Sequence, residues 1–260
     1  MIVDCHTHIN CPSSDIDTAE HLEACEKVDA CIVLASGQAG SAEANKETSK
    51  YISQHRKMVG FAAVNPAEDG IGAKTITATT HELNLKGVVM YCPESKFHPA
   101  HTRAMRLYEV AEELGLPIFF HVSTRLRPDA ILDYAQPYLL DEAARKFSSL
   151  KIVIGSMGMP FVSQTICMLA KHENVYADLT ISPRKVWEIY NIVVGAHEAG
   201  VMDKLLFGSG YPFARADNCI ETLLGFNKLL ADTNLPTVPR EKIRAIIERD
   251  TLALLGISRS

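Results

Sequence analysis

Two histidines separated by a single residue stand near the start of the chain, in the segment IVDCHTH. His6 and His8 follow a short apolar run, and residues i and i+2 of a strand point to the same side of a sheet. Two imidazoles at this spacing can share one metal ion at the roughly 2.0–2.1 Å that zinc requires. We therefore interpret the pair as candidate metal ligands at the end of a first strand, with an exposed loop dipeptide as the alternative.

A third histidine ends another apolar run. His121 closes the segment LPIFFH, where it can act as a third ligand or, alternatively, bond a backbone carbonyl as a half-buried side chain. Beside His6 and His8 the ligand role is favoured. Three histidines with an open fourth position are a known ligand set for catalytic zinc. The sequence thus predicts one divalent ion, with zinc first and manganese or iron as alternatives.

Eight short apolar runs of the kind found in buried parallel strands divide the chain. They cover residues 1–5, 30–35, 58–64, 86–91, 117–122, 151–156, 174–179 and 204–209. Amphipathic patterns typical of helices lie between them, most clearly at 101–115, at 182–200 with a Ser182 cap, and at 240–256. Eight such units without a composition break predict one α/β domain over residues 1–260, a (β/α)₈ TIM barrel. A doubly wound sheet is the alternative, although no GxGxxG motif follows the first strand.

The barrel prediction places the histidines on the catalytic face of the fold. In this fold the carboxyl ends of the strands and the loops after them form the catalytic face. His6 and His8 end the first strand and His121 ends the fifth, so all three are expected to point into the barrel at that face. Asp4 is expected to alternate away from the interior.

Composition restricts the class of partner. The chain has 260 residues, 47% hydrophobic and 22% charged, with a net charge of -5 and no basic run, which argues against a nucleic-acid partner. Seven cysteines without CxxC spacing indicate reduced thiols rather than a disulfide framework. Neither a signal peptide nor a membrane-length apolar run is visible. We expect a cytoplasmic protein with a small-molecule substrate, no membrane partner and, as is reasonable for a barrel enzyme, a possible homodimer.

Four segments carry a family resemblance that spans essentially the whole chain. They read IVDCHTHIN, LGLPIFFHVST, LKIVIGSMGMPF and DKLLFGSGYPF, in this order. The arrangement resembles the amidohydrolase superfamily, specifically its amidohydrolase-related branch of TIM barrels, which includes metal-dependent hydrolases and decarboxylases. The resemblance implies a metal site at His6, His8 and His121.

Two residues depart from the pattern that the resemblance implies. Ser156 stands where the family usually carries a histidine, and Gly210 where it usually carries an aspartate that accepts a proton from the attacking water. Glycine cannot accept a proton, whereas the Ser156 hydroxyl can bond a substrate oxygen. Asp178, at the end of the seventh predicted strand, is the candidate replacement for the missing carboxylate. Its alternative role is that of a capping or loop carboxylate.

Further side chains are predicted to contact the substrate. Arg125 and Arg127 follow His121 on the same loop face, where a guanidinium could hold a carboxylate in a bidentate manner. Glu94 follows the fourth predicted strand, and Tyr211 follows the eighth, where the resemblance implies that it shapes the pocket. The alternative for the arginines is solvated loop charge. Cys92 could ligate a soft metal, but a small packed residue is the commoner role of a lone cysteine.

Three functional hypotheses follow from these residues. By resemblance, the first is a metal-dependent hydrolase of a small cyclic ester or amide. The second is a metal-dependent carboxy-lyase or hydratase of the same superfamily, which would have an arginine-lined pocket. The third is a barrel that has lost catalysis and binds a ligand, which the departures at Ser156 and Gly210 favour and the retained histidines oppose. A two-metal site is not expected, because no lysine follows the fourth predicted strand.

Overall fold

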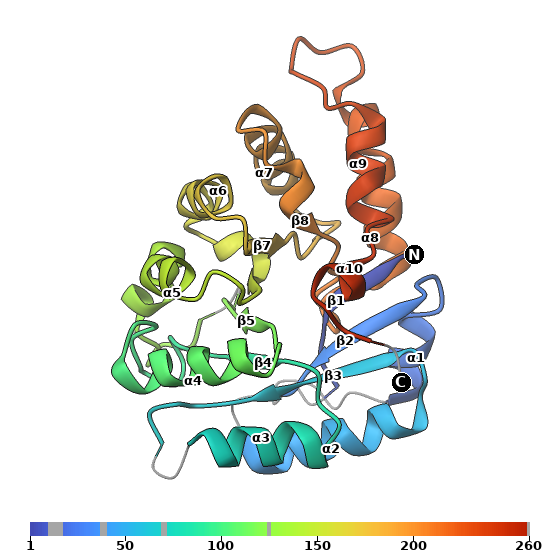
Figure 1. The fold of residues 1–260 in the computed structure, drawn as a ribbon. Coiled ribbons are helices and arrows are strands. Elements are labelled where there is room, and N and C mark those ends of the chain that lie inside the picture. Colours follow the sequence, from blue (N-terminus) through green and yellow to red (C-terminus); the bar gives the residue numbers. More distant parts are fainter. Residues whose placement is uncertain (10–17, 37–40, 69–71, 124–125, 259–260) are drawn as a thin grey trace.

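Eight parallel strands form the centre of the protein, and each pairs with the next one along the chain (Figure 1). The computed structural model describes residues 1–9, 18–36, 41–68, 72–123 and 126–258. The strands are β1 (Val3–Thr7), β2 (Ala30–Leu34), β3 (Met58–Ala63), β4 (Val88–Met90), β5 (Ile118–Phe120), β6 (Ile152–Ile154), β7 (Val175–Asp178) and β8 (Leu205–Leu206). All eight predicted strands are therefore confirmed.

Helices surround the strands (Figure 1). The α-helices are α1 (Thr18–Ala24), α2 (Ser41–Gln54), α3 (Ala73–Glu82), α4 (Thr102–Glu113), α5 (Asp141–Lys146), α6 (Val162–Lys171), α7 (Val186–Glu198), α8 (Ala216–Leu224), α9 (Arg240–Ile247) and α10 (Thr251–Leu254). Short 3₁₀ helices cover Leu132–Ala135, Pro137–Leu140, Gly155–Gly158, Met202–Lys204 and Phe226–Leu230. This is the predicted (β/α)₈ TIM barrel.

Backbone hydrogen bonds join the first strand to the segment around the last one. The N–H of Cys5 donates to the Phe207 carbonyl at 2.9 Å, and the N–H of His8 donates to the Tyr211 carbonyl at 3.0 Å. In the opposite direction, the N–H of Gly210 donates to the His6 carbonyl at 2.9 Å. The barrel closes at this seam, next to both histidines of the first strand.

Two predicted helices differ from the observed ones. The helix expected over 182–200 begins only at Val186, so Ser182 does not cap it. The helix expected over 240–256 is two helices, α9 and α10, separated by a break. The Asp250 carboxylate causes a new start after the break, because it accepts a hydrogen bond from the Ala253 N–H at 3.0 Å and so caps α10.

The core has two layers, separated by the strands. The side chains of the inner layer point into the barrel and include Cys5, Ile32, Phe119 and Leu206. The side chains of the outer layer lie between the strands and the helices. Leu252 of α10 packs with the inner set, so the last helix helps to fill the barrel. Among the residues that the structure describes, no helix combines the length and the apolar character needed to cross a bilayer.

Candidate metal centre

A β-bulge in the first strand decides where its histidines point. Asp4 lies opposite Cys31 of β2 and Thr7 lies opposite Val33, so two residues, Cys5 and His6, face the single residue between them on β2. Strict alternation from the inward Cys5 would turn His6 outward. The bulge inserts one extra residue and lets both side chains point into the barrel. The predicted inward direction is thus observed for both histidines: His6 and His8 follow i, i+2 alternation, and the bulge lets Cys5 point inward as well.

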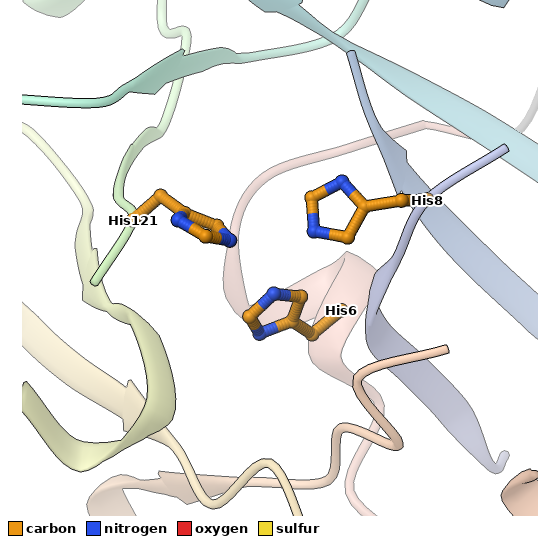
Figure 2. A group of neighbouring side chains, drawn as sticks. All are labelled: His6, His8 and His121. Atoms are coloured by element: carbon orange, nitrogen blue, oxygen red, sulfur yellow. The ribbon is translucent and has the colours of Figure 1, made fainter. Parts of the chain in front are cut away.

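His6, His8 and His121 lie together at the carboxyl ends of β1 and β5 (Figure 2). Their ring centroids are 5.2 Å apart for His6 and His8, 5.0 Å for His6 and His121, and 5.2 Å for His8 and His121. One nitrogen of each ring can be chosen so that all three lie within 4.8 Å of one another. Figure 2 shows nitrogens of the three rings directed into the space between them. The sequence therefore identified three side chains that the fold brings to one point.

Burial keeps two of these imidazoles neutral. It lowers the pKa of His8 from 6.5 to about 3, with the charge of His6 adding to the effect. Burial also lowers the pKa of His121 well below its usual value, and the neighbouring imidazoles of His6 and His8 act in the same direction. A neutral imidazole has a free lone pair, which is the form that binds a metal ion.

The outward nitrogens of the first-strand pair have hydrogen-bond partners. His8 Nδ1 lies 3.0 Å from the carbonyl oxygen of Leu34, which can only accept a hydrogen bond. His6 Nδ1 lies 3.2 Å from Asp178 Oδ2 and 2.9 Å from Thr180 Oγ1. We assign the proton to Nδ1 in both rings, because an ionised carboxylate and a carbonyl are acceptors only. Nε2 of each ring then carries no proton, and its lone pair is available to a metal ion at the centre.

These features fit a divalent transition-metal ion. The donors are three neutral nitrogens, which suit zinc better than the hard cations calcium or magnesium. A carboxylate or carbonyl on the second nitrogen is the usual arrangement around metal-binding histidines. His121 Nδ1 is buried and makes no hydrogen bond to any residue that the structure describes. The donor set thus matches the expected one-metal site, and His6, His8 and His121 would hold the ion.

Asp178 and Ser156 lie on the Nδ1 side of the His6 ring. Asp178 is fully buried, and its Oδ2 accepts a hydrogen bond from the Ser156 N–H at 2.8 Å. Ser156 Oγ donates to Thr180 Oγ1 at 3.0 Å, and Thr180 Oγ1 in turn donates to Asp178 Oδ1. Asp178 does not join the group of three histidines whose nitrogens converge. The two predicted catalytic residues therefore contact each other, and Asp178 contacts His6 Nδ1.

The predicted substrate-binding residues have different surroundings. Arg127 forms a two-bond ion pair with Asp129, at 2.9 and 3.1 Å, and its side chain is half exposed. Arg125 lies outside the described residues. Tyr211 is buried, with its ring 4.9 Å from that of His21 on α1. Glu94 is half-buried, and burial raises the pKa of its carboxyl.

Cys92 is a packed residue and not a candidate thiolate ligand. Its side chain is fully buried in the outer core layer. Burial raises the pKa of the thiol well above its usual value, and the nearby charge of Glu94 adds to this. A protonated thiol is a poor metal ligand. The structure thus agrees with the packing alternative.

Thr180 is the member of the site that sequence reasoning missed. It stands two residues after Asp178, beyond the end of β7 and with a φ of +39°, so strand alternation gives no signal for it. Its hydroxyl contacts His6, Asp178 and Ser156. Nothing in the residue type alone distinguishes it from an ordinary loop threonine.

Comparison with solved structures supports the fold. At a TM-score of 0.74 and 11% identity, the chain resembles a 2,6-dihydroxybenzoate decarboxylase from Rhizobium, with 98% of each chain covered. It also resembles a dihydroxybenzoic acid decarboxylase from Polaromonas with bound manganese, at 0.70 and 13%, covering 100% of this chain and 98% of the other. A probable 2-pyrone-4,6-dicarboxylic acid hydrolase from Acinetobacter baumannii matches at 0.68 and 13%, covering 98% and 99%.

Sequence comparison identifies the family. No curated protein matches the chain. The family model described as amidohydrolase matches residues 3–247, which include all three histidines and the whole barrel. This match, the (β/α)₈ barrel and the convergence of His6, His8 and His121 agree with one another. The chain belongs to the amidohydrolase family.

Proposed function

We propose that the protein is a metal-dependent hydrolase that opens a small cyclic ester or amide at the site formed by His6, His8 and His121. The observation that carries the proposal is the convergence of three buried histidines, two of them held neutral by burial, at the carboxyl ends of β1 and β5. Zinc is the ion that this donor set favours, with manganese or iron as alternatives. When bound, the ion supplies Lewis-acid polarisation of a substrate carbonyl oxygen.

Hydrolysis also needs a group that accepts a proton from the attacking water. The described residues offer a continuous chain of hydrogen bonds for this purpose, from the Ser156 hydroxyl through the Thr180 hydroxyl to the Asp178 carboxylate. In the proposed step, Ser156 Oγ accepts a proton from water while its own proton moves to Thr180, whose proton moves to Asp178. Ser156 and Asp178 are thereby the proposed catalytic residues in place of a carboxylate at position 210.

A carboxy-lyase is the second candidate, and one feature of the site favours it. Among the described residues, the group whose ligand atoms converge contains three histidines and no aspartate or glutamate, so a substrate carboxylate would not face a carboxylate ligand. Decarboxylases are also among the solved structures with this fold. Of the two arginines expected to clamp such a carboxylate, Arg127 is paired with Asp129, and Arg125 lies outside the described residues.

Metal content decides whether the site is a metal centre. We would measure zinc, manganese and iron by elemental analysis in tag-free protein, with His6→Ala and His121→Ala as test variants. His101→Ala is the matched control, because His101 is an exposed residue that caps α4. One ion per chain, lost in both test variants and kept in the control, is the expected result. No metal, even after incubation with zinc, would overturn both enzyme hypotheses and leave a ligand-binding barrel.

The two reactions are separated with the metal-loaded protein. Proton release from a panel of lactones, and loss of the ring from a panel of cyclic amides followed by chromatography, report hydrolysis, and CO₂ release from a panel of aromatic carboxylic acids reports decarboxylation. Proton release that is lost in Asp178→Asn supports the hydrolase. CO₂ release without proton release would replace it with the lyase.

A further inference from the structure

The bulge that turns His6 into the barrel rests on one buried carboxylate. Asp4 begins the irregular stretch of β1 and is fully buried. Its Oδ1 accepts a hydrogen bond from the His6 N–H at 3.2 Å and from the Ser209 N–H at 2.9 Å. The first bond spans the bulge, and the second ties the bulge to the segment that follows β8.

These two bonds give the N–H groups of His6 and Ser209 an acceptor inside the protein. An extra residue in one strand disrupts the ladder locally and leaves backbone groups unpaired. A buried N–H without a partner is destabilising, and a carboxylate is a stronger acceptor than a neutral oxygen. The Asp4 side chain bonds the N–H of the very residue whose side chain must turn inward. The carboxylate therefore stabilises the backbone form in which His6 points at the centre.

Asp4 acts from outside the barrel. It lies opposite Cys31, whose side chain belongs to the outer core layer, while the three histidines point inward. The His6 ring lies 5.2 Å from that of Phe119, a member of the inner layer. An effect of Asp4 on the centre must therefore pass through the backbone of His6.

We propose that Asp4 is a positioning residue for the metal centre: its carboxylate holds the β-bulge at Cys5 and His6, and so aims His6 at His8 and His121. The inference rests on the proposed metal-dependent function. It adds a residue that would contact neither the ion nor the substrate. Breaking the carboxylate contact should allow β1 to return to strict alternation, which turns His6 away from the other two histidines.

The test compares Asp4→Ala with a matched buried anchor elsewhere. Asn45 is the control, because its buried side chain bonds the N–H and carbonyl of Ala63 at 2.8 and 3.0 Å and so ties α2 to β3. Zinc affinity is measured by competition with a chromophoric chelator, and stability by urea unfolding in EDTA. Asp4→Ala should weaken zinc binding about 10- to 100-fold, as expected for loss of a group that orients a ligand. Asn45→Ala should lose stability but keep zinc affinity within about twofold.

Asp4→Asn keeps the test decisive if Asp4→Ala does not fold. The asparagine retains Oδ1 as an acceptor, so its zinc affinity should fall less than about 10-fold, between wild type and Asp4→Ala. Wild-type zinc affinity in a folded Asp4→Ala, or an equal loss in Asn45→Ala, would overturn the proposal.

A metal-free measurement separates this inference from the proposed function. Nitrogen-15 NMR of the histidine rings in EDTA reports whether His6 carries its proton on Nδ1, as its contacts with Asp178 and Thr180 predict. Loss of that tautomer in Asp4→Ala supports the positioning role even if the wild type binds no zinc. An unchanged tautomer, with an unchanged His6 ring in a crystal structure of Asp4→Ala, would refute it.

Discussion

The methyl group of Thr180 fills the space beside Gly210: a Cβ atom built on Gly210 would lie 2.5 Å from Thr180 Cγ2. Gly210 also has a φ of +67°, a conformation that most side chains disfavour. The side chain that would project from the eighth strand segment and the side chain that supports His6 therefore compete for one volume. The presence of Thr180 and the lack of a side chain at 210 are two parts of one arrangement.

An aspartate at position 210 should destabilise the protein unless Thr180 is also replaced. Gly210→Asp should lower the free energy of unfolding by about 1–3 kcal/mol, because the new Cβ contacts Thr180 and the backbone has a positive φ. Combining it with Thr180→Gly should recover part of the loss. Gly200→Asp is the control, since Gly200 has a φ of +73° and nothing within 4 Å of a built Cβ. Equal losses in both single variants would show that the contact with Thr180 has no effect.

The Thr180 hydroxyl should contribute to metal affinity separately from its shape. Thr180→Val keeps the branched side chain but removes the oxygen 2.9 Å from His6 Nδ1, so zinc affinity should fall about 10-fold. Thr180→Ser, which keeps the oxygen, should bind zinc nearly as wild type does. Isothermal titration of the metal-free proteins gives both values. The same affinity in the valine and serine variants would contradict this role.

The segment after β8 can approach the site closely only because Gly208 has no side chain. A Cβ on Gly208 would lie 2.8 Å from Asp178 Oδ1 and 3.0 Å from the Cβ of His6. Gly208→Ala should therefore destabilise the protein by about 1–3 kcal/mol and displace His6, with a measurable loss of zinc affinity. Gly72→Ala is the control, because nothing lies within 4 Å of its built Cβ. Urea unfolding and zinc titration of both variants test this, and wild-type zinc affinity in Gly208→Ala would contradict it.

Acid should destabilise the metal-free protein through its buried histidines. Burial lowers the pKa of His8 from 6.5 to about 3 and of His21 to about 4, so the unfolded chain binds more protons than the folded one between these values. Stability should therefore fall as the pH drops below about 6.5, by up to about 1.4 kcal/mol per pH unit for each such histidine. Asp4, whose pKa burial raises from 3.8 to about 6, acts in the opposite direction over that range.

Urea unfolding in EDTA between pH 7 and pH 4.5 measures this slope. His8→Asn should reduce the slope, because it removes one of the contributing groups. His101→Asn controls for loss of an imidazole at the surface. An unchanged slope in His8→Asn would mean that this histidine is not kept neutral by its surroundings.

The strands and the three histidines could be predicted because local pattern determines them. Apolar runs identified all eight strands, and each histidine of the group directly follows or ends such a run. Other features depend on distant segments and could not be predicted from local pattern. Cys5 and His6 both point inward because of a bulge whose register depends on β2, and Thr180 matters because residue 210 has no side chain. The sequence did contain one unused signal, the Asp250 cap that starts α10.

The seam between β1 and the segment after β8 also sets an order of assembly. His6 and His8 are synthesised long before Gly210 and Tyr211, to which their backbones bond. A nascent chain that stops before residue 207 holds these histidines on an open strand edge, with the Asp4 carboxylate lacking its bond to Ser209. The centre can therefore mature only after the segment around residue 210 has been synthesised. Metal uptake would then distinguish chains that contain this segment from chains that stop before it.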